Sequence, residues 1–255
     1  MVGLIAERVA IPKLAFVTAW HLVGITHEPH PVLGTNRHFV MTDDASRRLT
    51  ARTWTLLAEL GLARRASVNP VFANTLTTIA EPDREYYGWS NTGTDHAALL
   101  VAAKHPHAIR VATNDHIVVL DPIGADWLPD DFVSGLPEVA AAVVAPTSVA
   151  ADLYRNPDRR DPRKPLAEPP DTTAVNYVRA LLKAPRDAVH QLYTARRDID
   201  GERIRSVPLS AIDLTGRGRV LAYTNYDDEG HENLHVVSGT AHNLITTLEH
   251  TNQLL

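Results

Sequence analysis

The apolar and polar positions of the chain follow one plan that occurs twice. In residues 75–90 and again in residues 178–193, an apolar helical stripe leads to a proline, then to charged residues and an aromatic-bearing strand. A proline ends a helix because it lacks the backbone N–H and pushes the preceding residue out of the helical region. The repetition predicts a duplicated helix-then-sheet unit with pseudo-two-fold symmetry. No catalytic residue type recurs at matching positions, which favours a binding protein over an enzyme.

Capping residues mark the ends of the predicted helices. Asp43 or Asp44 is expected to cap one helix that Gly61 ends, and Asn69 to cap a second helix that Pro82 closes. Further helices are expected over residues 14–23, 126–136 and 172–184, and from Ser238 or Thr240 through Leu248. Each half of the chain is therefore expected to carry helices before and after its strands.

Short runs of β-branched, aromatic and alternating residues predict strands in both halves. They lie at residues 85–90, 97–103, 109–113 and 117–120, and at 189–196, 207–213, 220–226 and 234–237. Tight turns between them favour antiparallel meanders. The result is an α+β fold in which the strands form one sheet or two adjoining sheets, with a helical cluster at each end. Between the halves, Thr147 or Ser148 is expected to cap a short helix after Pro146.

A length of 255 residues admits one large domain or two modest ones. Composition divides the chain into residues 1–154, a proline- and charge-rich linker over 155–171, and residues 172–255, and we expect one integrated domain. The linker carries five basic residues in positions 155–164, but two aspartates interleave with them. A solvated loop is therefore favoured over a phosphate-binding patch, which stays as the alternative.

The composition is that of a globular protein, with 44% hydrophobic and 22% charged residues. A net charge of −5 disfavours nucleic acid as the main partner. The absence of cysteine excludes disulfides and thiolate chemistry and agrees with a cytoplasmic location. No stretch approaches the roughly 20 apolar residues of a membrane span, so neither export by a cleaved signal nor membrane insertion is expected.

One segment matches the HExxH pattern of zinc proteases, with His231, Glu232 and His235. That pattern works on a helix, which places both imidazoles on one face. Here the segment lies between a glycine turn and two valines, so it reads as a strand, in which residues four apart are separated by roughly 13 Å. The extended signature also fails, because Gly239 and His242 are out of step by one residue. A metal-dependent hydrolase using His231 and His235 remains the alternative function.

The other candidate chemistry is sparse. His27 and His30 occupy a proline-rich loop, and two more histidines flank Pro106, where solvated polar roles are expected rather than metal ligation. No nucleophile elbow, P-loop or dinucleotide-binding glycine pattern occurs. We therefore predict no catalytic residues, no cofactor and no metal. The aromatic residues Tyr86, Tyr87 and Trp89 alternate along a strand and are expected to contribute to the core.

Several runs of the sequence resemble the EspG family of type VII (ESX) secretion-associated proteins of actinobacteria. They are GLARRASVNPVFANTLTTIAEP, the strands around Leu120-Asp121-Pro122, and VRALLKAPRDAVHQLYTARRDIDGERIRSVPLSAIDLTGRGRVLAYT. The similarity extends from about Asp43 to the C-terminus, and its most specific part is the DxDGxR motif that begins at Asp198, with Asp213 and Gly218-Arg219. The resemblance implies a large antiparallel sheet flanked by two helical bundles.

The same resemblance implies a cytosolic chaperone, not an enzyme, that binds PE-PPE heterodimers through the apolar tip of the PPE partner and directs them to secretion. It points to a hairpin loop of the first half and to the second helical bundle as the binding surface. Carried onto this chain, the implied partner-binding residues are Lys104, His105, Pro106, His107, Tyr177, Leu181, Leu244 and Leu248. Unpaired sheet edges would also permit a homodimer. A nucleic-acid-binding adaptor that uses residues 155–164 is a further alternative.

Overall fold

The computed structural model describes residues 2–35, 41–93, 95–156 and 172–255. Its first half contains these elements: β1 (Val9–Pro12), α1 (Lys13–Val23), the 3-10 helix η1 (Pro31–Leu33), α2 (Asp43–Glu59), β2 (Ala63–Arg64), β3 (Ser67–Val68), α3 (Pro70–Ala80), β4 (Arg84–Thr92), β5 (Asp95–Lys104), β6 (His107–Thr113), β7 (Ile117–Ile123) and α4 (Leu128–Ser134). The second half contains β8 (Thr147–Ala150), α5 (Ala151–Arg155), α6 (Thr173–Lys183), β9 (Arg186–Arg197), β10 (Arg203–Arg205), β11 (Leu209–Leu214), β12 (Gly218–Tyr226), β13 (Glu232–Ser238) and α7 (Ala241–Gln253).

All the long strands of the described chain join one antiparallel sheet in the order β1-β7-β6-β5-β4-β9-β11-β12-β13-β8. The order reads the same from both ends: first the strand that opens the unit, β1 or β8, and then a four-stranded meander. The two units meet where β4 pairs with β9, and Tyr87 lies opposite Tyr193 in that pair. Of the two arrangements left open, the single sheet is therefore the one that forms, and the α+β fold with internal duplication is confirmed.

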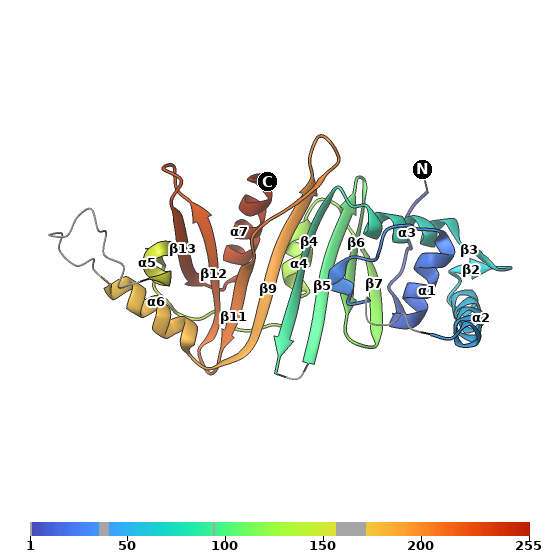
Figure 1. Cartoon of the computed structure of the whole chain (residues 1–255), viewed down its shortest axis with the longest axis horizontal. Helices are drawn as coiled ribbons and strands as arrows, with labels where there is room; N and C mark the ends of the chain where they lie inside the picture. Colours follow the sequence, from blue (N-terminus) through green and yellow to red (C-terminus); the bar gives the residue numbers. More distant parts are fainter. Residues whose placement is uncertain (1, 36–40, 94, 157–171) are drawn as a thin grey trace.

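Helices cover the two faces of the sheet differently. On the face that bears Tyr87 and Ile212, called the front here, α1, α2 and α3 pack over the first unit and α5 and α6 over the second. Figure 1 shows these two clusters at opposite ends of the molecule. On the other face, called the back, α4 and α7 pack together across the junction of the units. The middle of the front face, along β4 and β9, lies between the two end clusters.

Local signals explain most helix boundaries. Asn69 accepts a hydrogen bond from the N–H of Val71 at 3.0 Å, as a capping residue should, and Thr240 caps α7 in the same way. The prediction for α2 was wrong by a residue, because Thr42 is its cap and the two aspartates lie in its first turn. Acidic side chains are also favourable there, next to the positive end of the helix dipole.

The segment after Pro146 differs from the prediction. Thr147 and Ser148 do not cap a helix; they lie in β8 and pair with Val236 and His235 of β13. The helix that follows begins only at Ala151. A strand of four residues is too short for its period to be read, and its backbone partner stands far along the chain. Most of the predicted linker, residues 157–171, lies outside the described residues.

This arrangement suggests a different division of the chain. β8 and α5 occupy, in the second unit, the places that β1 and α1 occupy in the first. We therefore propose that the second unit begins between Ser134 and Thr147 and not after the linker. Within the described residues, no helix has the length and apolar character required to cross a membrane.

Candidate partner-binding surface

The hairpin loop predicted from the family resemblance is the turn between β5 and β6. His105 and Pro106 are exposed at its tip, and Lys104 and His107 pair across its base. Lys104 Nζ lies 3.3 Å from Glu81 at the end of α3, an ion pair that is about half exposed. The turn is therefore anchored to the first helical cluster, and its tip is free to meet a partner.

A second turn lies beside this one and carries the DxDGxR motif. The strand pairing brings the two turns together, because Asp83, just before β4, donates its N–H to the carbonyl of Ala103 on one side and accepts the N–H of Arg197 on the other. Within the turn, Asp198 Oδ1 accepts the N–H groups of Asp200 and Glu202, each at 2.9 Å. These bonds fix the backbone of a loop whose tip residue, Ile199, is 100% exposed. A rigid turn that presents a bare isoleucine is a suitable anchor for an apolar partner.

Arg203, the last residue of the motif, ties three elements together. Its guanidinium pairs with Glu85 of β4, lies 3.0 Å from His30 Nε2 and stands over the ring of Tyr87 at 5.4 Å. Burial alone would raise the pKa of Glu85, but the hydrogen bond and charge of His30 and the charge of Arg203 hold that pKa below its usual value. The motif is therefore structural at both ends: one aspartate closes the turn and the arginine holds β10 on the sheet.

His30 was expected to be solvated, and that expectation was wrong. Its side chain is 9% exposed, its ring meets Tyr87 edge-on at 4.6 Å, and its Nδ1 accepts the N–H of Val32. The loop that carries it folds back over β4, which no local pattern reveals. His27 keeps an exposed position, where it lies 3.6 Å from Glu81.

An aromatic floor occupies the middle of the front face. Tyr87 and Tyr193 stack at 5.2 Å with an angle of 8° between their planes, and Trp89 meets both edge-on. Tyr86 points to the back and packs on Phe132, so the predicted core role of the aromatic run is confirmed. Tyr193 and Trp89 are half-buried and border the exposed Gln191. The open strip between the helical clusters thus combines flat rings with polar edges, as partner-binding surfaces often do.

The helical residues expected at the surface divide into two groups. Tyr177 of α6 is 38% exposed, whereas Leu181 is 2%, Leu244 1% and Leu248 0% exposed. These leucines form the apolar stripes by which α6 packs on the front and α7 on the back of the sheet. A partner cannot touch them on the folded protein, and the two helices lie on opposite faces. As partner contacts, the three leucines are therefore corrected to core residues.

The HExxH segment is a strand, as predicted. His231 precedes β13 and lies 3.5 Å from Asp227, whereas His235 stacks on Tyr223 and bonds to Asn225 at 2.6 Å. Glu232 pairs with Arg155 of α5. Each of the three side chains thus has its own partner, and the described residues contain no group of histidines and acids placed to bind one metal ion.

A buried polar cluster lies on the back face of the second unit. Asp213 accepts hydrogen bonds from Arg219 at 2.6 Å and from His190 at 3.0 Å, and His190 also contacts Ser90 of β4 at 2.7 Å. Burial would raise the pKa of Asp213, but the hydrogen bonds from His190 and Arg219 lower it to about 2. Asp213 and Arg219, which carry part of the family resemblance, therefore stabilise the sheet rather than face a partner.

Sequence analysis did not single out Ile199, although it lies within the DxDGxR motif. A turn closed by an aspartate and a left-handed glycine, with φ of +82° at Gly201, must project the residue between the aspartates into solvent. The contribution of Tyr193 and Trp89 to one floor depends on the pairing of β4 with β9, and no local signal reports that pairing.

Comparison with known proteins agrees with this architecture. The model of the EspG family matches residues 12–250. Among solved structures, the Mycobacterium tuberculosis type VII secretion system chaperone EspG5, in complex with a PE25-PPE41 dimer, matches with a TM-score of 0.66 over 96% of each chain. The sequence identity is 16%, so this match shows a common fold. A search of curated proteins found no match. Because the family model spans nearly the whole chain, this protein belongs to the EspG family.

Proposed function

We propose that this protein is a type VII secretion chaperone that binds a PE-PPE type heterodimer in the cytoplasm and covers the apolar tip of the PPE partner until export. The observation that carries the proposal is the fold that the whole chain has in common with EspG5, whose structure was determined with a PE25-PPE41 dimer bound. Such a function needs neither a cofactor nor ATP, because burying an aggregation-prone patch is favourable by itself.

The contact surface that we propose is the end of the sheet where the two neighbouring turns lie. It comprises the tip of the β5–β6 turn, with His105 and Pro106, and the tip of the β9–β10 turn, with Ile199. Tyr177 of α6 is the candidate on the second helical bundle. An apolar side chain that is fully exposed in the free protein gains free energy when a partner buries it, about 25 cal/mol per Å².

Co-expression with each PE-PPE pair of the source genome, followed by size-exclusion chromatography with mass determination, tests the proposal. We expect one stable complex that contains one copy of each partner. In that complex, Ile199→Asp should weaken binding at least about tenfold, since it places a charge in an apolar contact. The matched control is Val143→Asp, because Val143 is equally exposed but lies beside the start of β12, at the opposite end of the sheet.

The two parts of the proposal fail in different ways. A well-folded protein that binds none of the pairs would contradict the chaperone function. A complex whose affinity Ile199→Asp leaves unchanged would contradict only the proposed contact surface.

A further inference from the structure

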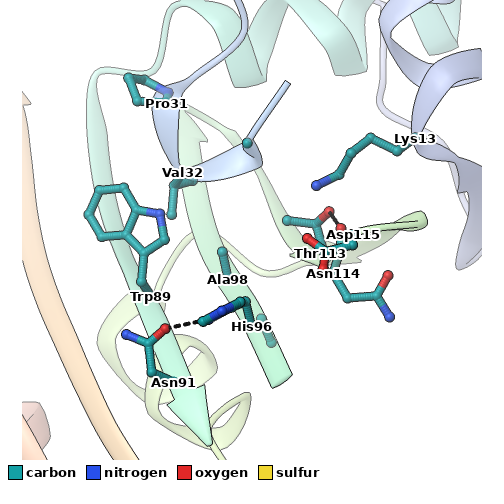
Figure 2. A pocket seen from close by; sticks show the side chains of 12 residues that line it. Lys13, Pro31, Val32, Trp89, Asn91, His96, Ala98, Thr113, Asn114 and Asp115 are labelled. Carbon is teal, nitrogen blue, oxygen red and sulfur yellow. Dashed lines mark hydrogen bonds between the residues drawn. The ribbon is translucent and has the colours of Figure 1, made fainter. Parts of the chain in front are cut away.

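A hollow of about 420 Å³ lies on the front face of the first unit, apart from the turns discussed above. Its floor is formed by β4 and β5, one side by η1, and the other by the turn between β6 and β7 together with the first residue of α1. Figure 2 shows Trp89 and Val32 on one side and Lys13 opposite them. The volume is within the range of small-ligand sites, about 300–1,000 Å³.

Lys13 is the unusual residue of this hollow. It is only 6% exposed, and its backbone N–H is held by the carbonyl of His116 at 2.8 Å. Its ammonium lies beside the bare Cα of Gly34, where an added Cβ would stand 3.4 Å from Nζ. Figure 2 shows the side chain reaching into the hollow, with no hydrogen bond between Lys13 and the other lining side chains drawn there. The stem of the side chain is buried and its ammonium faces the hollow, so an anion in the hollow would gain a charge-assisted hydrogen bond from Nζ.

The surroundings of Lys13 agree with this reading. α1 begins at Lys13 with no side-chain cap, so the positive end of the helix dipole lies at the same wall. Burial lowers the pKa of Lys13, and the charge of Asp115 acts in the opposite direction. Asp115 is exposed at the rim and forms no ion pair within 4 Å of Lys13. The ammonium of Lys13 is therefore available to pair with an oxyanion of a ligand.

The opposite wall is apolar and rigid. Trp89 is held edge-on by Tyr87 and Tyr193, and Val32 and Ala98 complete the wall beside it. At the outer end, Asn91 and His96 are paired at 2.6 Å. A flat group can lie against the indole without any rearrangement of these residues.

We propose that this hollow binds a carboxylate carried on a flat apolar group, with the carboxylate at Lys13 and the apolar group against Trp89. This site is independent of the proposed chaperone function and is separate from the turns assigned to the PE-PPE partner. The chemistry suits a free aromatic acid and equally an acidic side chain next to an aromatic one in a polypeptide, so the test includes both sources.

The proposal is tested by titrating the full chain with 4-fluorophenylacetate and monitoring binding by fluorine NMR. We expect saturable binding that weakens at least about tenfold for the neutral amide 4-fluorophenylacetamide and for Lys13→Met. Lys183→Met, which removes an exposed lysine of α6, should leave binding unchanged. Asp115→Asn should tighten binding a few-fold, because it removes a negative charge near the site. The comparison of acid and amide uses the unaltered protein, so it tests the need for a carboxylate even if Lys13→Met fails to fold.

A capped peptide, acetyl-Gly-Glu-Phe-Gly-amide, distinguishes the sources. Binding of the acid alone would assign a small molecule, and displacement of the acid by the peptide would assign an acidic segment of a polypeptide. Equal binding of acid and amide, undiminished binding to Lys13→Met, or no binding of either probe at millimolar concentration would overturn the proposal.

Discussion

A buried ion pair holds neighbouring strands of the second unit together. Asp213 of β11 lies directly opposite Arg219 of β12, and His190 of β9 completes the cluster. Arg219 also holds the segment before β8, because its N–H bonds to Ala140 and its carbonyl accepts the N–H of Ala142, both at 2.8 Å. Gly218 permits this approach: its φ is +91°, and a Cβ there would stand 2.3 Å from the Ala140 oxygen. Asp213, Gly218 and Arg219 thus connect four parts of the chain.

The depressed pKa of Asp213 makes stability depend on acidity. Because its pKa is about 2 when folded and 3.8 ordinarily, the ionised form stabilises the fold at neutral pH, and this contribution is lost as pH falls from about 4 to 2. Linkage gives a loss of about 2 kcal/mol by pH 2. We expect Asp213→Asn to reduce the free energy of unfolding by about 3–5 kcal/mol at pH 7, since it leaves Arg219 buried without its counter-charge.

Urea unfolding of the wild type and Asp213→Asn from pH 7 to pH 2 measures this effect. The difference between the two proteins should shrink by about 2 kcal/mol towards pH 2. The exposed Asp228→Asn is the control and should follow the wild type throughout. A difference that stays constant with pH would show that Asp213 does not titrate as described.

At the scale of elements, an amphipathic helix can use its apolar residues for core packing or for contact with a partner, and the sequence alone does not distinguish these two roles. In α6, Leu181 points into the core formed with β11, β12 and β13, and Tyr177, one turn earlier, is partly exposed. In α7, Leu244 and Leu248 pack with α4 beneath the junction of the units. A leucine at helical spacing is an ordinary core residue, and only its measured burial distinguishes it from a contact for a partner.

Alanine substitution of Leu181 and of Tyr177 in α6 distinguishes core packing from partner contact. Leu181→Ala should lower the free energy of unfolding by about 2–5 kcal/mol, because it leaves a cavity in the core. Tyr177→Ala should change it by less than about 1 kcal/mol while weakening a PE-PPE complex. Denaturant unfolding of both variants, with binding measured on folded protein, checks the pair. A neutral Leu181→Ala would contradict the packing of α6 described here.

At the scale of the whole molecule, the two units have a hydrophobic core in common. The back-face core takes Tyr86 and Phe132 from the first unit and Leu192, Leu221 and Leu248 from the second. The front face is continuous across the junction through the stack of Tyr87 on Tyr193. Separation at this point would expose the edges of β4 and β9 and the apolar faces of α4 and α7.

We therefore expect neither residues 1–146 nor residues 147–255 to unfold cooperatively when produced alone. Co-produced, the fragments should associate and recover a single transition, because the junction is antiparallel pairing along β4 from Arg84 to Asn91. Circular dichroism melting curves of each fragment and of the mixture provide the measurement. A fragment that melts cooperatively by itself would instead show an independent domain.

What the sequence determined by itself was local: the helix caps at Asn69 and Thr240, the meanders, the strand character of the HExxH segment, and the duplication. These follow from period, turn chemistry and steric limits within a few residues. Tertiary structure decided the rest. The pairing of β4 with β9, the burial of His30, the place of β8 beside β13 and the place of Lys13 in the hollow depend on contacts between distant segments. Such contacts depend on how distant segments pack together, and the side-chain pattern along the chain does not indicate which strand of one unit lies beside which strand of the other.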